Sequence, residues 1–373
     1  MSIAVSGMNE ADNTDPTERF LCLHEIVAAA EDALDPNIWN YLRGATETET
    51  TAKRNRQALD SVAFRPRVLN DMREVSVGGR LLGKDMTLPV LLAPVGSLES
   101  FEPGGGRTAM RAAAGFGNAL MLSNVGTIPI EEVAAAADGL LISALYKRGD
   151  DGWLDEQVQR AKDAGCFAVS LTVDSAYYSR RERDIAARFV KPWRAGAGAD
   201  WQAALNWKDV ERFKERYDIP LILKGIATAE DAAMAVERGV DVVYVSNHGG
   251  RQLDHGRGAL DVLPEVVDAV AGRAEIVVDG SIQRGTDLVK AIALGANAVG
   301  MGRLFCCGLA AAGEAGVLRM LSLLRDEVKT AVALLGATSL SEVGPRHVRQ
   351  AAPVTDPGVF SAFPLLYRET SQF

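Results

Sequence analysis

The sequence predicts an α/β protein: one (β/α)8 barrel of the TIM type, with a helical extension at the N-terminus and a flap after the fourth strand. From residue 88 onward, eight short apolar runs alternate with amphipathic segments of helical spacing. The runs are continuously apolar, which is typical of parallel strands buried on both faces. None of them is followed by GxGxxG, which argues against dinucleotide-binding domains. The alternation therefore favours a closed parallel barrel.

The N-terminal region is expected to contribute helices outside the barrel. Residues 1–16 are polar and acidic, and we expect a flexible tail there, followed by one domain over 17–373. The tail lacks a basic start followed by an apolar core, so no signal peptide is predicted. One helix is expected over Thr17–Leu34, and further helices on both sides of Gly44. The next segment, FRPRVLNDM, should be extended.

The eight expected strands share a continuous apolar character and a polar or glycine end. They are LPVLLAP ending at Pro94, ALMLSN at Asn124, LLISALY at Tyr146, FAVSLTVD at Asp174, PLILKG at Gly225, VVYVSN at Asn247, EIVVDG at Gly280 and AVGMG at Gly302. Several helical segments between them end in glycine, a favourable C-cap. The stretch from Tyr177 to Trp207 interrupts the alternation and is too long for a plain barrel loop. We interpret it as a partly mobile flap over the active-site face.

Charge and composition argue against several kinds of partner. The net charge of −9 is spread along the 373 residues, whereas nucleic-acid binding needs clustered Lys and Arg. No run of 18 apolar residues appears, so no membrane span is expected. The cysteines form no CxxC pair, which favours free thiols in a reducing compartment: Cys22, Cys166, Cys306 and Cys307. We expect a cytoplasmic protein without a bound metal.

Polar side chains gather at the expected strand ends, where the active site of a β/α barrel forms. A random set of strand ends would not bring so many ionisable groups to one rim. The groups are Ser123, Tyr146, Thr172, Asp174, Lys224, Ser246, His248, Asp279 and Arg303.

His248 is the candidate catalytic base of this rim. In isolation it could equally cap a strand end, but two glycines and Arg251 follow it. Glycine lets the backbone approach a ligand, and the arginine fork matches a carboxylate. Asp174 is either a structural turn residue or the carboxylate that orients His248. A base beside a carboxylate clamp fits proton abstraction from a hydroxy acid.

The remaining strand ends indicate a cofactor that carries a phosphate. Lys224 ends an apolar strand at the barrel mouth, where it could stabilise an anionic cofactor or form a Schiff base. Four residues follow the seventh and eighth strands, the usual phosphate position in such barrels: Gly280, Ser281, Gly302 and Arg303. Backbone N–H groups together with Arg303 would suit a phosphate.

The motifs that carry these residues resemble the FMN-dependent 2-hydroxy-acid oxidase and dehydrogenase family. They run in order from about residue 17 to about residue 345, and SNHGGRQLD is the most specific of them. The others are YLRGATETET, FRPRVL, LPVLLAP, LTVD, ILKGIATAEDA, VVDGSIQRGTD and AVGMGR. The resemblance implies an FMN cofactor and oxidation of a 2-hydroxy acid to the 2-oxo acid, with hydride transfer to flavin N5. His248 would take a proton either from the hydroxyl during that transfer or from the α-carbon. The resemblance also implies reoxidation by O2 with formation of H2O2, or by another acceptor in a dehydrogenase, and a homotetramer.

The resemblance also implies a role for each site residue. His248 matches the catalytic base, supported by Asp174, and Tyr146 the tyrosine that contacts the substrate hydroxyl. The substrate carboxylate would be clamped by Arg251 and Tyr41, assisted by Arg181. Lys224 would lie near flavin N1 and O2. The other implied cofactor contacts are Pro94, Val95, Gly96, Ser123, Thr172, Ser246, Asp279, Gly280, Gly302 and Arg303.

Three positions around the flavin and the substrate depart from the family pattern. Ala144 replaces a usual glutamine, which removes one hydrogen bond to the flavin. Val125 replaces a frequent tryptophan in the substrate pocket, so the pocket should admit a larger or differently shaped substrate. Gly96 stands where alanine is common beside N5, which could alter access of solvent or oxygen.

Two further departures concern the phosphate. Ser281 and Gln283 replace a glycine and a phosphate-binding arginine in DGSIQRG. Both positions still count as cofactor contacts, but binding is then expected to depend on Arg303, Arg284 and backbone donors.

Several alternatives stay open. The chain could be a monooxygenase or dehydrogenase acting on a larger or atypical hydroxy acid. It could be an FMN barrel isomerase of the isopentenyl diphosphate type, although HGGR and the carboxylate clamp argue against that. Ala144 and Gln283 leave room for a catalytically weakened FMN-binding barrel. The apolar C-terminal stretch AAPVTDPGVFSAFPLLY would contact other subunits or pack on its own barrel.

Overall fold

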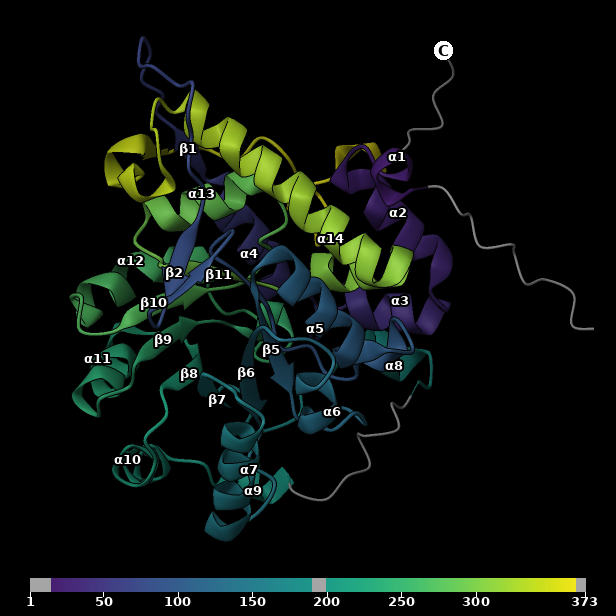
Figure 1. The fold of residues 1–373 in the computed structure, drawn as a ribbon, viewed down its shortest axis with the longest axis vertical. Helices are drawn as coiled ribbons and strands as arrows, with labels where there is room; N and C mark the ends of the chain where they lie inside the picture. Colours follow the sequence, from purple (N-terminus) through teal and green to yellow (C-terminus); the bar gives the residue numbers. More distant parts are fainter. Residues whose placement is uncertain (1–14, 190–198, 367–373) are drawn as a thin grey trace, which may run out of the picture.

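The computed structural model describes residues 15–189 and 199–366, which form a closed eight-stranded barrel surrounded by helices (Figure 1). All neighbouring barrel strands are parallel, and they follow one another around the ring as β10-β11-β4-β5-β6-β7-β8-β9. The predicted fold class is confirmed. Each strand comes from one of the eight apolar runs: β4 Val90–Leu92, β5 Ala119–Ser123, β6 Leu140–Leu145, β7 Ala168–Thr172, β8 Leu221–Ile226, β9 Val242–Val245, β10 Glu275–Val278 and β11 Ala298–Met301.

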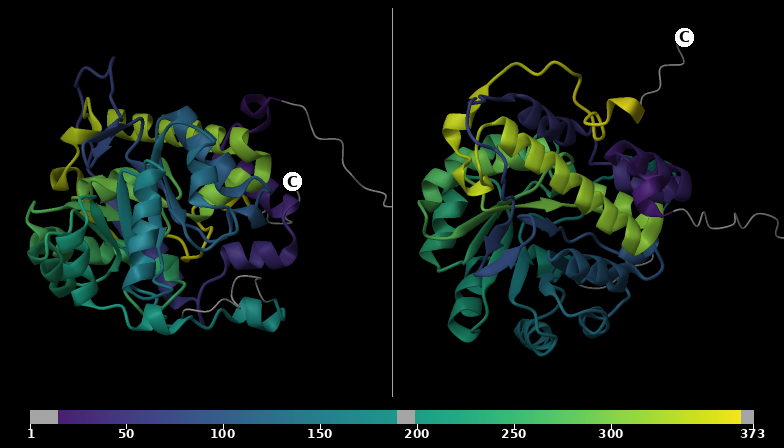
Figure 2. Two further views of the ribbon diagram at one scale, coloured as in Figure 1. Left: turned by 60° about the horizontal axis from the view of Figure 1, so that its bottom comes forward. Right: turned by 45° about the horizontal axis from the view of Figure 1, so that its top comes forward.

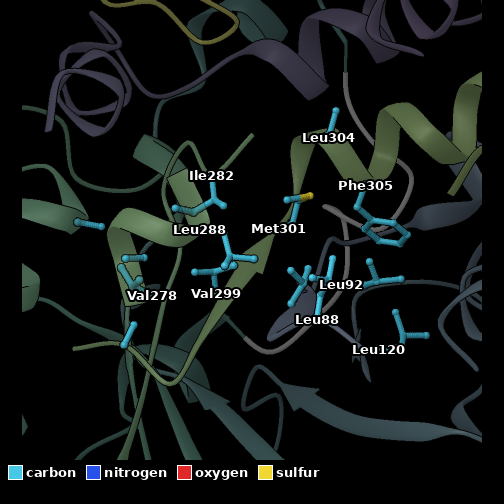
Figure 3. Close-up of a cluster of buried hydrophobic side chains, with 14 of the residues drawn as sticks. Leu88, Leu92, Leu120, Val278, Ile282, Leu288, Val299, Met301, Leu304 and Phe305 are labelled. Carbon is cyan, nitrogen blue, oxygen red and sulfur yellow. The ribbon is translucent and has the colours of Figure 1, made fainter. Parts of the chain in front are cut away.

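The strands are apolar throughout because both of their faces are buried. Along β4, Leu91 points into the barrel interior, whereas its neighbours Val90 and Leu92 belong to the layer beneath the helices. Figure 3 shows this outer layer, where Val299 and Met301 of β11 lie among side chains of the surrounding helices. The interior is filled rather than open: a Cβ on Gly300 would lie only 1.7 Å from the Tyr244 hydroxyl.

Helices follow the strands and cover the barrel. They are α5 Gly105–Phe116, α6 Ile130–Ala134, α7 Asp151–Asp163, α10 Trp207–Arg216, α11 Ala229–Glu237, α12 Ala259–Val270, α13 Gly285–Ala293 and α14 Arg303–Leu334. As expected, glycines with positive φ follow several helices directly or within two residues: Gly117, Gly165, Gly239 and Gly295. The long helix α14 is broken in its backbone geometry at Ala312 and Gly313.

Helix α14 is the one helix in the described part of the chain that is long and apolar enough to cross a membrane. Its most apolar window is 61% buried inside the domain, and it packs along α2 and α5. We therefore interpret it as a core helix.

The N-terminal extension consists of four helices: α1 Pro16–Arg19, α2 Leu23–Ala33, α3 Pro36–Arg43 and α4 Thr50–Asp60. Both views in Figure 2 show the first of them beside α14. The single helix expected over Thr17–Leu34 is wrong, because the chain leaves the helical conformation at Phe20. Phe20 is buried, and the Glu25 carboxylate accepts hydrogen bonds from the Leu21 and Cys22 amides, which starts α2 anew. The expected tail lies almost wholly outside the described residues.

Short elements complete the domain. Strands β1 Val62–Phe64 and β12 Val348–Gln350 pair antiparallel, so only the beginning of the predicted extended segment is a strand. The hairpin β2 Gly79–Leu81 and β3 Lys84–Met86 places Leu81 and Met86 against the interior core of the barrel. The remaining single turns are η1 Leu98–Ser100, η3 His248–Gly250, η4 Leu340–Glu342, η5 Pro345–His347 and η6 Pro364–Leu366.

The expected flap contains α8 Glu182–Ala186, which packs on α3, and α9 Ala199–Ala203. Its central residues, 190–198, lie outside the described residues, so its mobility stays a prediction. The C-terminal stretch packs on the same domain. Phe360 stacks on Trp39 with ring centroids 5.3 Å apart, and Phe363 meets His24 edge-on. All four cysteines are free thiols, three of them buried and Cys22 partly exposed.

Candidate active site

A cavity of about 1750 Å³, its open mouth included, lies at the C-terminal ends of the barrel strands. Of the predicted site residues, these line it: Tyr41, Pro94, Val95, Gly96, Ser123, Val125, Tyr146, Arg181, Lys224, His248, Arg251, Asp279, Gly280, Ser281, Gln283, Gly302 and Arg303. Thr172, Asp174 and Ser246 do not line the cavity, although all three belong to the strand ends that surround it. The structure therefore places the predicted strand-end residues in and around one cavity.

His248 connects two other predicted catalytic residues. Its Nε2 lies 3.1 Å from the Tyr146 hydroxyl, which faces the cavity, and its Nδ1 lies 3.2 Å from Asp174 Oδ1. The residue sits in turn η3 with a positive φ of 59°, and its amide donates to Ser246 Oγ. The imidazole is therefore held between a carboxylate behind it and a phenol in front of it. That is the arrangement of a base whose orientation is imposed by a third group.

The two glycines after His248 serve backbone packing. A Cβ on Gly250 would lie 2.5 Å from the Ala52 amide nitrogen of α4. A Cβ on Gly249 would lie 2.8 Å from Arg303 Nη1. Only Gly249 also lines the cavity. We expected these glycines to let the backbone approach a ligand. In the structure they chiefly let η3 approach α4 and Arg303 closely.

Electrostatics favour a neutral base next to an ionised carboxylate. Burial lowers the pKa of His248, and the Asp174 charge opposes that effect without cancelling it. Burial opposes ionisation of Asp174, yet its interaction and hydrogen bond with His248, together with the Lys224 charge, hold its pKa below the ordinary value. Burial raises the pKa of Tyr146, which keeps its hydroxyl protonated. His248 can thus accept a proton while Tyr146 donates a hydrogen bond.

Two arginines offer unused donors to the cavity. Arg251 donates through Nη1 to the carbonyls of Tyr41 and Gly44, while its buried Nη2 has no partner among the described residues. Its guanidinium lies over the Tyr41 ring, 4.5 Å from the centroid. Arg181 lies over the Tyr178 ring, and its buried Nε also has no partner in the described chain. Buried guanidinium donors without partners indicate an anion site.

Lys224 belongs to a buried network at the floor of the cavity. Its ammonium donates to Ser246 Oγ at 3.0 Å and lies 3.4 Å from Asp279 Oδ2. Ser246 in turn donates to Asp279 at 2.7 Å. The lysine is only 3% exposed, and an ion-paired ammonium is not a nucleophile. This geometry favours the prediction that Lys224 stabilises an anionic cofactor over the prediction that it forms a Schiff base.

The phosphate end of the cavity is poorer in cations than expected. Arg303 lines it but donates to the carbonyls of Leu42, Gly44 and Gly249, and burial lowers its pKa to about 9. The prediction that Arg284 helps to bind the phosphate is wrong. Arg284 pairs with Glu327 at 2.6 Å and does not line the cavity. The expected role of Arg284 in phosphate binding therefore has no support.

Gln283 fastens the chain rather than supplying a charge. Its Nε2 donates to the Val359 carbonyl of the C-terminal stretch at 2.7 Å, and its buried Oε1 has no partner in the described chain. Ser281 adopts a positive φ of 62°, as a glycine would, and its carbonyl accepts from Arg56. Backbone amides remain available as donors at this end. Helix α14 begins here, and its N-cap Gly302 provides no side-chain cap.

The wall near β5 follows the predicted departures. Val125 lines the cavity, and a Cβ on Gly96 would lie 3.1 Å from Val125 Cγ1, so the two positions are in close contact. Ala144 is fully buried in β6. Sequence reasoning missed several polar residues that also line the cavity: Lys147, Arg148, Ser175, Tyr178, Gln202 and Gln252. Arg148 could have been noticed, because it follows the active-site tyrosine by two residues.

Comparisons with known proteins agree with this geometry. The model of the FMN-dependent dehydrogenase family matches residues 30–202 and 191–350. Glycolate oxidase 1 of Zea mays is 37% identical over 363 residues, which cover 91% of this chain and 97% of the relative. Glycolate oxidase of Spinacia oleracea is 36% identical over 87% of this chain and 95% of its own. The crystal structure of a mandelate oxidase matches with a TM-score of 0.84 at 37% identity, covering 90% of this chain and all of that one.

The matched regions include every predicted strand end, and the fold and the reaction class predicted from the sequence are both confirmed. That reaction class is FMN-dependent oxidation of a 2-hydroxy acid. The chain belongs to the FMN-dependent 2-hydroxy-acid oxidase and dehydrogenase family.

Proposed function

We propose that this chain binds FMN in the cavity and oxidises an (S)-2-hydroxy acid to the 2-oxo acid, with O2 as acceptor and H2O2 as product. One observation carries the proposal: His248 is held between Asp174 and Tyr146, in the same cavity as the unpartnered donor of Arg251. The names of relatives support the substrate class, since Arabidopsis thaliana has a peroxisomal (S)-2-hydroxyacid oxidase that is 35% identical over 354 residues.

The cavity fits FMN at both of its ends. On the ring side, the buried Lys224 ammonium would stabilise negative charge gained on reduction, opposite the strand-end segment Pro94–Gly96. On the phosphate side, the uncapped N-terminus of α14 offers backbone amides and the positive end of a helix dipole. A Cβ on Gly302 would meet nothing closer than 3.7 Å, so this approach is open. FMN supplies the acceptor for the two electrons.

The side chains of the cavity would bind the substrate and accept its proton. The free donors of Arg251 and Arg181 would bind the substrate carboxylate, with Tyr41 beneath them. The Tyr146 hydroxyl would hold the substrate oxygen beside His248 Nε2, which takes the proton released during oxidation. Asp174 stabilises the imidazolium that forms, since its carboxylate already faces Nδ1.

The test is anaerobic reduction of bound flavin by 2-hydroxy acids, followed by peroxide detection after oxygen is admitted. His248→Ala should keep FMN bound and slow flavin reduction by about 10²- to 10⁴-fold, because the base is lost. Unimpaired reduction in this variant would remove His248 from the mechanism. Peroxide in step with the 2-oxo acid would support the oxidase over a monooxygenase or a dehydrogenase.

A weakened FMN-binding barrel is the second candidate, favoured by one observation. Gln283 places a neutral amide where a cation was expected, and the nearby arginines are engaged with backbone carbonyls or Glu327. A purified chain that is colourless and binds no added FMN would support this candidate. The homotetramer and the cytoplasmic location stay predictions, which sedimentation velocity and fractionation of the native cells would test.

A further inference from the structure

Arg148 differs from the other arginines of the cavity because it makes neither a hydrogen bond nor a ring contact within the described part of the chain. It lies two residues beyond Tyr146 at the end of β6, lines the same cavity as His248 and Arg251, and is half-buried. Its side chain makes no hydrogen bond or ion pair within residues 15–189 and 199–366. Burial lowers the pKa of this guanidinium, opposed by Tyr146. A half-buried charge without a counter-ion is unfavourable until an anion arrives.

Neighbouring cations are neutralised by the protein itself. Lys147, directly before Arg148, pairs with the buried Asp209 and lies 3.6 Å from Asp151. Arg212, close to the same carboxylate, pairs with Asp151 and Asp155. The flap segment 190–198, VKPWRAGAG, contains no acidic residue that could serve Arg148. Among the described residues, Arg148 therefore lacks an acidic partner, as do Arg181 and Arg251, but unlike those two arginines it is not already assigned to the substrate 1-carboxylate.

The cofactor phosphate is not the missing anion. Gly280 and Ser281 follow β10, and Gly302 begins α14 after β11. In the ring order of the barrel, β6 is four strands away from β10 in either direction, so Arg148 lies at the opposite rim. A phosphate at the N-terminus of α14, which follows β11, would lie three strands away from Arg148 around the barrel mouth.

Arg148 lines the same cavity as Val125, where the side chain of a substrate would have room. The ends of β5 and β6 are joined by two hydrogen bonds, from Asn124 Nδ2 to the Tyr146 carbonyl and from the Tyr146 amide to Asn124 Oδ1, both 3.0 Å. This junction places Val125 and Arg148 on neighbouring strand ends. A hydroxy acid with its carboxylate at Arg251 and its hydroxyl at Tyr146 has this wall free for its third substituent. The short Val125 leaves room there.

We propose that Arg148 binds a second anionic group on the substrate, so that the preferred substrates are 2-hydroxy acids with a carboxylate or phosphate at the far end of the side chain. This inference rests on the proposed function and names its substrate class. The three arginines then divide between two anions, Arg251 and Arg181 at the 1-carboxylate and Arg148 at the distal group.

The test compares substrates of equal chain length with and without the second charge. Anaerobic flavin reduction would be measured for 2-hydroxypentanedioate against 2-hydroxypentanoate, and for 2-hydroxy-3-(phosphonooxy)propanoate against 2,3-dihydroxypropanoate. The native chain should favour a dianionic member by about 10- to 100-fold in kcat/KM, the effect of a hydrogen-bonded charge pair. The first pair reports a distal carboxylate and the second a distal phosphate.

Variants locate the effect at Arg148. Arg148→Gln should abolish the preference and leave kcat/KM for the monoanionic member of each pair within twofold, whereas Arg148→Lys should keep part of the preference. Arg111→Gln is the matched control, since Arg111 on α5 is an exposed arginine paired with Glu314 outside the cavity. It removes the same formal charge and should leave the preference unchanged. FMN content and thermal unfolding would be recorded for each variant.

Two results would overturn the inference: no preference for either dianion in the native chain, or an equal loss for both members of a pair in Arg148→Gln. The substrate comparison in the native chain needs no variant, so it decides even if Arg148→Gln does not fold. Failure of every hydroxy acid to reduce the flavin would instead contradict the proposed function.

Discussion

The two sides of the cavity differ in what their polar side chains contact. On the base side, the side chains of Tyr146, Asp174 and His248 bind one another, whereas Arg251 binds backbone carbonyls through Nη1 and keeps its Nη2 free for a ligand. On the phosphate side, formed by Gly280, Ser281, Gln283, Gly302 and Arg303, the long side chains bind the protein backbone instead. One side therefore acts through side-chain chemistry, and the other offers mainly backbone amides at the start of α14.

This difference explains why one side was easier to predict. Side-chain chemistry can be recognised from residue types at strand ends, as with His248 and Asp174. A site made of backbone amides depends on the path of the chain, and residue identity shows that path only indirectly.

The largest effect on the rate of flavin reduction is expected from removing the charge of Asp174, the carboxylate that faces His248 Nδ1. Asp174→Asn removes the charge that stabilises a protonated His248 and lets the imidazole adopt the wrong tautomer. We expect flavin reduction to slow by about 10³-fold, with FMN still bound, measured by anaerobic stopped-flow absorbance. Asp151→Asn, in which an exposed carboxylate on α7 is changed in the same way, is the control and should stay within about twofold of the native rate. A small effect of Asp174→Asn would mean that His248 needs no carboxylate.

The next largest effect is expected when one arginine from each side is changed to lysine and the two variants are compared in kcat/KM and thermal stability. Arg251→Lys keeps the charge but loses the fork that offers Nη2 to the substrate, so kcat/KM should fall by about 100-fold while FMN affinity is kept. Arg303→Lys should act differently, because Arg303 ties Gly44 and Gly249 together. It should lower the thermal midpoint of the FMN-free chain. Equal kinetic profiles for the two variants would remove the distinction between the two sides.

A smaller effect is expected from adding a cation to the phosphate side. Gln283→Arg would place a guanidinium at the edge of the cavity and should tighten FMN binding by about tenfold, the effect of one charge-assisted hydrogen bond. Gln283→Leu is the control, since it loses only the bond to the Val359 carbonyl. Fluorescence titration of the FMN-free chain measures both. Unchanged affinity in Gln283→Arg would indicate that backbone amides already suffice.

The sequence predicted the barrel well because its strands are short, apolar on both faces and bounded by polar residues. It failed at Phe20, where an apolar residue continues the helical pattern although the chain is extended there. The break depends on burial of Phe20 and on the cap from Glu25. In the site, the partners of Arg284 and Arg303 could not be predicted, because Glu327 and the Gly249 carbonyl reach them only through tertiary packing.

The smallest effect concerns pH and again tests the base side. Burial and the charges of Lys224 and Arg181 lower the pKa of His248, while Asp174 raises it, and the net direction is downward from 6.5. Because the base acts in its neutral form, kcat/KM should fall only as pH drops below a midpoint that lies under 6.5. In Arg181→Gln one cation is removed, so the midpoint should move upward, by less than about one pH unit. Native and variant profiles between pH 4.5 and 8 would show both, and a native midpoint at or above 6.5 would mean that the Asp174 charge outweighs burial.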